Sequence, residues 1–166
     1  MTDNNKPYIR VEHLKKYFST KRGMLHAVDD VSFDIQRGET LGLVGESGCG
    51  KSTLGRCLIR LLDSTSGSVM LQNPEDGSCI DVTKVDAATM KDLRKRVQIV
   101  FQDPYSCLNP RLSVWELIAE PLMVNRVYSD KAAMRKRIRE LMSTVGLAER
   151  LENSYPHELD GGRRQR

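Results

Sequence analysis

The feature that most constrains the fold is the stretch Leu41-Gly-Leu-Val-Gly-Glu-Ser-Gly-Cys-Gly-Lys-Ser-Thr53, which joins an apolar run to a glycine-rich loop and a helical pattern. Gly45, Gly50, Lys51 and Ser52 match the spacing G-x-x-x-x-G-K-[ST]. Glycines let the backbone bend sharply and bring its N–H groups close to phosphate oxygens. The helix that follows directs its positive dipole end toward the same anion. The stretch therefore predicts a phosphate-binding loop between a buried strand and a helix.

Two side chains of this loop have a direct chemical use with a nucleoside triphosphate. Lys51 can reach the terminal phosphates as a point charge, and the hydroxyl of Ser52 can ligate Mg²⁺. Glycine-rich turns also precede helices that bind nothing. Here the apolar strand before the loop and the periodic helix after it favour the phosphate-binding interpretation.

Composition is typical of a soluble globular domain: 166 residues, 39% hydrophobic and 29% charged, with a net charge of +4. The basic residues are dispersed in helical patterns with little aromatic interleaving, which favours solvated helix faces over a nucleic-acid surface. The four cysteines form no C-x-x-C pair, so we expect free thiols in a reducing cytosol. No apolar run approaches the length of a membrane span, and the first residues contain no apolar signal core. We therefore expect a cytosolic protein unless a partner holds it at a membrane.

Up to residue 102 the pattern is mixed strand and helix. Helices are predicted after the phosphate loop, from Leu54 to Leu62, and over Ala87–Arg96. A turn is expected at Thr20–Gly23 and a hairpin around 73–77. The segments with strand-like composition or alternation are Tyr8–Val11, Met24–Val28, Val31–Ile35, Thr40–Val44, Ser68–Gln72, Cys79–Val82 and Val97–Phe101.

From Asp103 onward the pattern is nearly all helical, which places a subdomain boundary there. Ser113 with Glu116 forms a capping-box sequence before one helix. A second, longer helix is capped by Ser129 or Asp130 and ends near Gly146. The apolar stripes of these two helices predict core, and they comprise Val114, Leu117, Ile118, Leu122, Met134, Ile138, Leu141 and Met142.

Three motifs occur in the order seen in one family. They are the phosphate loop, the strand that ends in Gln102, and the stretch His157-Glu-Leu-Asp-Gly-Gly-Arg-Arg-Gln-Arg166. Together they resemble the ATP-binding-cassette (ABC) transporter ATPases. The stretches Gly45–Arg56 and Val100–Arg111 make the chain most similar to the ATPase subunits of oligopeptide and dipeptide importers. Related ATPases import nickel and other solutes.

The resemblance implies an α/β P-loop NTPase fold of the ABC type. Such a fold has a RecA-like core, an antiparallel β subdomain and a helical subdomain. Residues 1–102 would form the nucleotide-binding core with the β subdomain and the phosphate loop. Residues 103–166 would form the helical subdomain, which ends in the signature motif and offers the surface for a membrane permease.

The resemblance also assigns roles to single residues, with ATP and Mg²⁺ as the ligands. Tyr17 matches the aromatic residue that stacks on adenine; the alternative is a half-buried strand aromatic. Gln102 matches the glutamine that reaches Mg²⁺ and senses the terminal phosphate, so Ser52 and Gln102 are the expected metal contacts. The expected nucleotide-binding residues are Tyr17, Gly45, Glu46, Ser47, Gly48, Cys49, Gly50, Lys51, Ser52, Thr53, Asp160, Gly161 and Gly162.

The signature motif departs from the family pattern at two positions. Asp160 stands where the family has serine, and Arg163 stands where it has glutamine. Asp160 can still cap the helix, but an ionised carboxylate donates no hydrogen bond. It would also repel the phosphate held by the opposite subunit, by about 4 kcal/mol per charge pair at ~4 Å and an effective dielectric of ~20. We therefore expect Asp160 to impair dimer closure and Arg163 to offset part of that effect.

The sequence reaches Arg166 before the family's Asp-Glu strand and switch histidine. His13, His26 and His157 lie in other contexts. On this reading the C-terminal part of the core is missing, and an apolar face and an unpaired strand edge are left exposed. Phosphoryl transfer would lose most of its positioning and electrostatic help, so we expect these 166 residues alone to be inactive as an ATPase.

The function that the resemblance implies is that of an importer ATP-binding subunit, which couples ATP binding and hydrolysis to peptide uptake through a membrane permease. It would work with a homologous second ATPase subunit or as a homodimer, and indirectly with a periplasmic or extracellular solute-binding protein. Its place would be peripheral, on the cytoplasmic face of the inner membrane, without nucleic acid. The alternatives are a truncated, non-hydrolysing nucleotide-binding remnant and a soluble ABC protein that acts on nucleic acid or the ribosome.

Overall fold

The computed structural model describes residues 6–74, 76–101, 103 and 107–166. The chain forms two compact units, Met1–Ile99 and Val100–Arg166. Each unit has its own hydrophobic core, as expected when few contacts cross a boundary. The units are defined by packing, and the assignment of residues 1–102 and 103–166 to functional subdomains stays a prediction.

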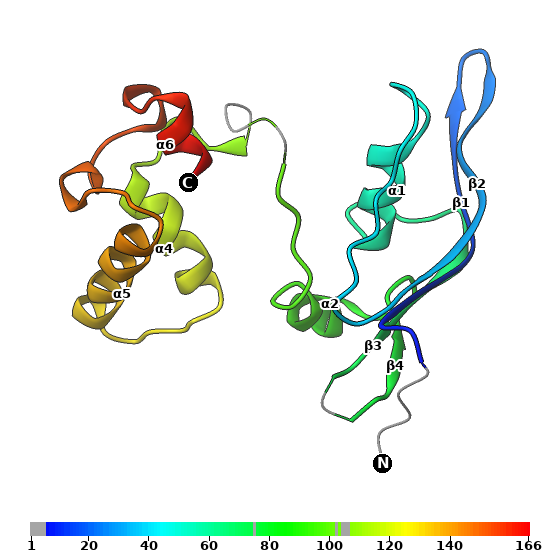
Figure 1. Ribbon diagram of the computed structural model, residues 1–166, viewed down its shortest axis with the longest axis horizontal. Coiled ribbons are helices and arrows are strands. Elements are labelled where there is room, and N and C mark those ends of the chain that lie inside the picture. Colours follow the sequence, from blue (N-terminus) through cyan, green and yellow to red (C-terminus); the bar gives the residue numbers. More distant parts are fainter. Residues whose placement is uncertain (1–5, 75, 102, 104–106) are drawn as a thin grey trace. The chain divides into compact units, whose positions relative to one another are not determined.

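The first unit is built on one long antiparallel hairpin (Figure 1). Strand β1 spans Ile9–Thr20 and strand β2 spans Gly23–Ile35, joined at the turn expected from the sequence. The strands predicted at Tyr8–Val11, Met24–Val28 and Val31–Ile35 are confirmed as parts of these two longer strands. Register shifts between Val11 and Leu14 and on to Tyr17 interrupt the alternation of β1, and so the sequence pattern shows it only in part.

A four-stranded sheet with the order β2-β1-β3-β4 carries this unit. The predicted hairpin is confirmed as β3, Ser66–Gln72, paired with β4, Cys79–Asp81. Helix α1, Lys51–Leu58, begins and ends earlier than the predicted Leu54–Leu62, and helix α2, Ala87–Leu93, is shorter than the predicted Ala87–Arg96. The core joins apolar residues of the sheet and both helices: Val11, Leu14, Val28, Leu54, Cys57, Val69, Leu71, Val82, Met90 and Leu93.

Two predicted buried strands are wrong for this structure. The segments Thr40–Val44 and Val97–Phe101 are irregular, and neither joins the sheet. Val44 is 93% exposed and Val100 is 96% exposed. A strand needs neighbours for its N–H and C=O groups, and among the residues that the structure describes these two segments have none in a ladder. Their apolar side chains other than Val97, which packs against the core, are therefore exposed.

The second unit is helical, as predicted from Asp103 onward. Helix α4 spans Val114–Val124 and begins with a complete capping box. Glu116 Oε2 accepts the N–H of Ser113 at 2.7 Å, and the Ser113 hydroxyl accepts the N–H of Glu116 at 3.3 Å. Helix α5 spans Lys131–Thr144, with Asp130 as its cap, and Gly146 follows with φ +70°. The core of this unit comprises Val114, Ala119, Met134, Ile138, Met142, Leu147, Leu151 and Leu159.

The remaining elements are short: the 3₁₀ turns η1, Glu149–Leu151, and η2, Pro156–Glu158, and the helix α6, Gly161–Gln165. Glu152, just after η1, is 9% exposed and ties this segment to α5. Its carboxylate accepts two hydrogen bonds from Arg139, at 3.1 and 3.3 Å. These hydrogen bonds lower the pKa of Glu152 against the opposing effect of burial.

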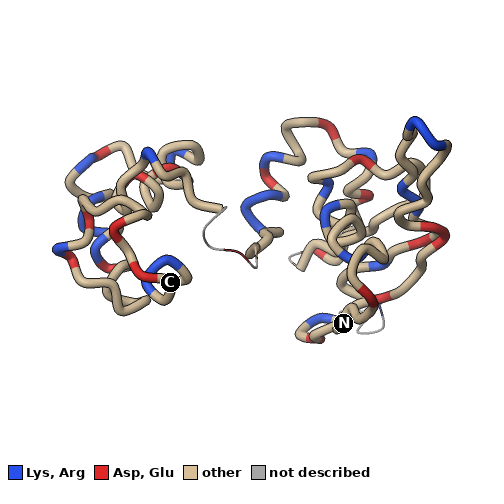
Figure 2. Tube along the Cα trace, turned by 90° about the horizontal axis from the view of Figure 1, so that it is seen from above, with Lys and Arg blue, Asp and Glu red and all other residues tan. Residues whose placement is uncertain are grey.

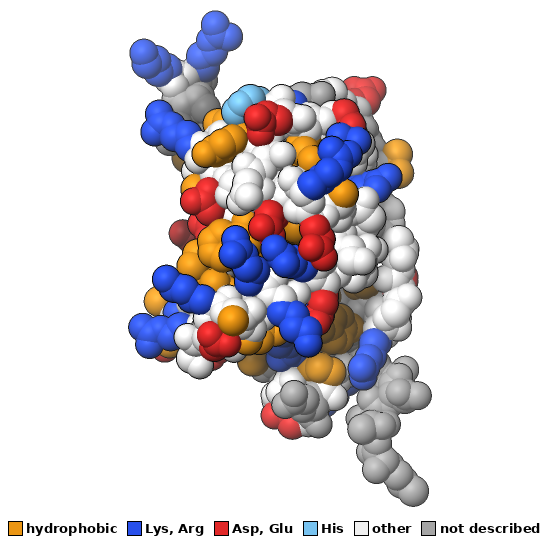
Figure 3. Space-filling view, turned by 90° about the vertical axis from the view of Figure 1, so that its left-hand side faces the viewer, with side chains coloured by type: hydrophobic (Ala, Val, Ile, Leu, Met, Phe, Trp, Pro, Cys, Tyr) orange, Lys and Arg blue, Asp and Glu red, His pale blue; other side chains and the backbone are white. Residues whose placement is uncertain are grey.

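Charges of both signs are interspersed along the chain (Figure 2). On the face of the helical unit seen in Figure 3, basic and acidic side chains lie side by side. Within the helical unit, Arg137 pairs with Glu140 at 3.2 Å and Arg135 with Glu152 at 3.5 Å. Among the described residues, no helix has the length and apolar character needed to cross a bilayer.

Candidate functional site

The phosphate loop ends directly against strand β2. Gly50, the residue before α1, has φ +95°, and a Cβ atom added to it would lie 2.0 Å from the carbonyl oxygen of Ala27. Only glycine allows this conformation and this approach without strain. The carbonyl of Gly50 then accepts the N–H of Leu54 at 2.8 Å, the first hydrogen bond of the helix. The loop is therefore fixed to the hairpin at its helical end.

The side chain of Lys51 is held by backbone carbonyls of the loop itself. Lys51 Nζ donates to the carbonyl of Gly45 at 2.8 Å and to that of Glu46, and it lies 3.5 Å from the sulfur of Cys49. The loop residues before Gly50 are exposed, as is Ser52 in the first turn of α1. A phosphate at this position would meet an ammonium group, a helix N-terminus and an accessible hydroxyl, which is the donor set that a Mg²⁺-bound triphosphate requires.

Tyr17 lies on β1 with its ring fixed by two partners on β2. Its ring is stacked on the His26 ring, with centroids 4.0 Å apart and planes 16° apart. Its hydroxyl donates to Asp29 Oδ1, which raises the pKa of Tyr17 and lowers that of Asp29. His26 Nδ1 is also 3.4 Å from Asp29 Oδ2. Tyr17 is thus a part-exposed aromatic with an ordered ring.

The signature residues belong to the helical unit. Asp160 caps α6 by accepting the N–H of Arg163 at 2.8 Å, which confirms the capping role. Arg163 Nε lies 3.3 Å from the other carboxylate oxygen of Asp160. Arg166 donates to the carbonyl of Gly146 at 3.0 Å. An arginine-rich groove of about 370 Å³ lies here, lined by Gly146, Leu147, Ala148, Arg150, Leu151, Asp160, Gly162, Arg163 and Arg166.

The predicted site residues therefore fall in two groups. Tyr17 and the loop from Gly45 to Thr53 share the first unit, joined where Gly50 meets Ala27. Asp160, Gly161 and Gly162 lie in the second unit. Gln102 lies outside the described residues. Among the residues that are described, no group of three or more His, Cys, Asp or Glu side chains is arranged to hold a metal ion. Magnesium contacts through Ser52 and Gln102 stay a prediction.

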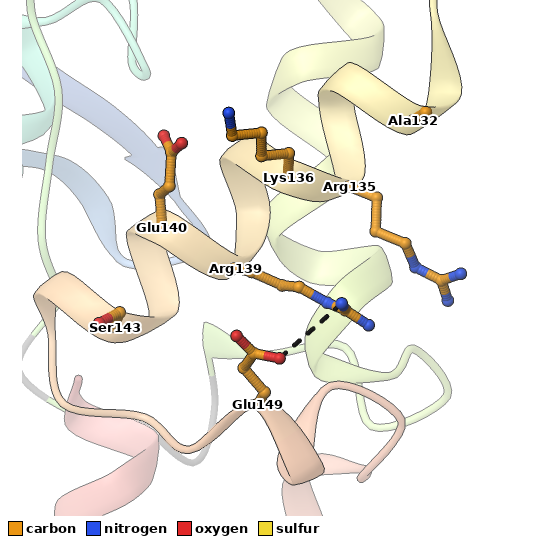
Figure 4. Close-up of a pocket in the computed structure, with 7 residues that line it drawn as sticks. All are labelled: Ala132, Arg135, Lys136, Arg139, Glu140, Ser143 and Glu149. Carbon is orange, nitrogen blue, oxygen red and sulfur yellow. Dashed lines mark ion pairs between the residues drawn. The ribbon is translucent and has the colours of Figure 1, made fainter.

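A groove of about 600 Å³ lies along α5 in the helical unit, and the phosphate-loop sequence belongs to the other unit (Figure 4). The two arginines of the groove are already paired with glutamates. Arg139 contacts Glu149 at 3.8 Å and Glu152 at 3.1 Å, and Arg135 contacts Glu152. A triphosphate would have to compete with these carboxylates, so the groove is a poor nucleotide site despite its size.

His26 and Asp29 are the residues that the sequence analysis missed. The signal for them was the turn at Thr20–Gly23, because an antiparallel hairpin closed there pairs Tyr17 with His26. Only the short segment Tyr8–Val11 was predicted as strand on that side. The strand predicted there ends before Tyr17, so the sequence does not predict its pairing with His26.

Comparison with known proteins gives the class of this chain. The family model described as "ABC transporter" matches residues 28–166. The chain therefore belongs to the ABC transporter family, and its fold is that of the ABC-type P-loop ATPases.

Curated relatives place it more narrowly by similarity. The chain is 47% identical over 158 residues to the oligopeptide transport ATP-binding protein OppF of Bacillus subtilis, with 95% of this chain and 50% of OppF covered. It is 45% identical to the glutathione import ATP-binding protein GsiA of Pectobacterium atrosepticum, with 96% of this chain and 26% of GsiA covered. The chain spans about half the length of OppF.

Solved structures give the same fold. The ATP-binding cassette MJ0796, solved as a dimer in a post-hydrolysis state bound to ADP and Pi, matches with a TM-score of 0.75 and 28% identity, covering 94% of this chain and 65% of that one. CbiO1 from Clostridium perfringens, part of the ABC transporter complex CbiONQ, matches with a TM-score of 0.67 and 26% identity, covering 97% of this chain and 59% of that one.

Proposed function

We propose that this chain is the ATP-binding part of an ABC importer subunit that couples ATP binding and hydrolysis to peptide uptake through a membrane permease. The observation that carries the proposal is the phosphate loop fixed to β2, with Lys51 at its mouth. The similarity to OppF and GsiA supports import of peptides or a peptide-like solute. In this proposal Lys51 binds the terminal phosphates, Ser52 and Gln102 contact Mg²⁺, and Tyr17 stacks on adenine.

The proposed partners follow from the same similarity. MJ0796 is dimeric and CbiO1 belongs to a transporter complex, which supports a paired ATPase subunit and a permease for this chain. The chain would then be peripheral, on the cytoplasmic face of the membrane. Exposed apolar side chains at the end of α4, namely Met123, Val124 and Val127, support a docking surface on the helical unit.

A polypeptide of these 166 residues is expected to bind ATP without hydrolysing it above background. It carries the phosphate loop, but its sequence contains neither the Asp-Glu strand nor the switch histidine expected for the family. Isothermal titration with ATP in the presence of Mg²⁺ tests binding, and phosphate release over hours tests turnover. Absence of ATP binding would contradict the proposal. Turnover that disappears in Lys51→Ala would contradict the expectation of inactivity.

The two other functions are less well supported. A non-hydrolysing nucleotide-binding remnant shares the phosphate loop, and reading the coding sequence downstream of Arg166 for an Asp-Glu strand separates it from an importer ATPase. A protein that acts on nucleic acid or the ribosome would need a surface of unpaired basic residues, whereas Arg135, Arg137 and Arg139 are paired with glutamates.

Replacing Asp160 with serine is expected to strengthen ATP-dependent dimerisation by about tenfold, less than full charge repulsion would give. Arg163 already neutralises part of the carboxylate, at 3.3 Å, and the pair is largely exposed. Light scattering of the purified protein with and without ATP measures the change. The single variant Arg163→Gln, which keeps the Asp160 carboxylate, tests the compensation and should dimerise less well than the wild-type protein. An unchanged monomer–dimer equilibrium in Asp160→Ser would contradict the proposed role of Asp160.

A further inference from the structure

The stacked pair of Tyr17 and His26 adjoins the residue that receives the phosphate loop. Ala27, whose carbonyl faces Gly50, directly follows His26 on β2. Tyr17 is the cross-strand partner of His26 on β1. The rings of Tyr17 and His26 therefore lie one residue along β2 from Ala27, which contacts the end of the phosphate loop. The stacked pair and the phosphate loop are thus neighbours through Ala27.

Two contacts hold the ring of Tyr17. The imidazole of His26 covers one ring face, at a centroid distance of 4.0 Å, while Asp29 fixes the hydroxyl at the ring's far end. His26 itself is held by Asp29, at 3.4 Å. An aromatic side chain on an exposed hairpin samples several rotamers unless such contacts restrict it, and that freedom is lost when a base stacks on it.

We propose that His26 is a positioning residue for base recognition: with Asp29, it holds the Tyr17 ring so that the two stacked rings form one platform for the adenine of the bound nucleotide. This inference rests on the proposed function, because it assigns the base contact of the same site. It assigns a role in base binding to His26 and Asp29, which need not contact the phosphates. The alternative is a stack that only stabilises the hairpin, and such a stack would leave base binding unaffected.

The test compares ATP with inorganic tripolyphosphate, which offers the loop the same phosphates without a base. Both affinities are measured by isothermal titration on the full chain. His26→Ala should weaken ATP binding by about two- to tenfold, the range for one aromatic pair, and leave tripolyphosphate binding unchanged. His26→Phe keeps a ring on Tyr17 and should restore ATP binding to within about twofold. His13→Ala is the matched control, because His13 lies on the same hairpin and contacts Asp30 instead, at 3.0 Å.

Three results would overturn the inference: unchanged ATP affinity in His26→Ala, an equal loss of ATP and tripolyphosphate affinity, or a loss in His26→Phe as large as in His26→Ala. Wild-type protein that binds tripolyphosphate but shows no added affinity for ATP would also overturn it, while leaving the phosphate loop intact as a site. Wild-type protein that binds neither ligand would overturn the proposed function itself and this inference with it.

Discussion

Replacing Lys51 with alanine is expected to weaken ATP binding by roughly 10- to 150-fold, the loss that corresponds to a charge-assisted hydrogen bond of about 1.5–3 kcal/mol. The ammonium of Lys51 already lies at the mouth of the loop, where it donates to the carbonyls of Gly45 and Glu46. Alanine removes the positive charge at the position where the terminal phosphates would lie. Isothermal titration measures the change. Adenosine, which carries no phosphate, should bind the variant as weakly as it binds the wild-type protein.

Arg56→Ala provides the control for this experiment. Arg56 lies on the same helix α1, is exposed, and belongs to the last turn, far along the helix from the loop. Its loss changes the net charge by the same amount and should alter ATP affinity by no more than about twofold. Equal losses in the two variants would show that net charge attracts ATP to the surface. Unchanged affinity in Lys51→Ala would show that ATP does not bind at this loop.

The helical unit was predictable because its signals are local. The capping box of Ser113 and Glu116 and the cap at Asp130 each satisfy orphan backbone groups within a few residues. Gly146, with its positive φ, ends the longer helix where the sequence placed the end. The apolar stripe through Met134, Ile138 and Met142 is buried as its spacing predicted.

The strands were harder because a sheet is not local. The apolar composition of residues 40–44 and 97–101 indicates that burial would stabilise these side chains. It does not identify a strand that would hydrogen-bond to their backbone. Where the partner is lacking, the same residues remain exposed, as Val44 and Val100 show. Conversely, much of β1 was overlooked because register shifts break its alternation between Val11 and Tyr17.

The candidate site shows the same contrast between local sequence signals and contacts that depend on tertiary packing. The phosphate loop and Tyr17 come from motif and resemblance, which are properties of short stretches. The contacts of Tyr17 with His26 and Asp29 depend on hairpin register, and the contact of Gly50 with Ala27 depends on how α1 packs against β2. Neither contact can be obtained from spacing within the loop. They are the features that the structure adds to the motif.

Gly50→Ala is expected to destabilise the first unit by about 2–5 kcal/mol, because two penalties add. An alanine at φ +95° leaves the conformations that L-residues favour, and its Cβ would lie 2.0 Å from a backbone oxygen that cannot rotate away. Relief requires α1 to move off β2, which would also displace the loop and Lys51. Urea unfolding followed by circular dichroism measures the stability. Amide exchange at Leu54, whose N–H bonds to the Gly50 carbonyl at 2.8 Å, measures the local effect.

Gly55→Ala is the matched control and should change stability in the opposite direction. Gly55 lies within α1, and a Cβ added there meets no atom within 4 Å. Alanine at that position should stabilise the helix by about 0.5–1 kcal/mol, because it lowers the entropy cost of forming it. A Gly50→Ala protein as stable as the wild type, with unchanged exchange at Leu54, would show that the loop is not fixed on Ala27. The His26–Tyr17 platform would then lose its link to the phosphate loop, because Ala27 is the residue that joins them.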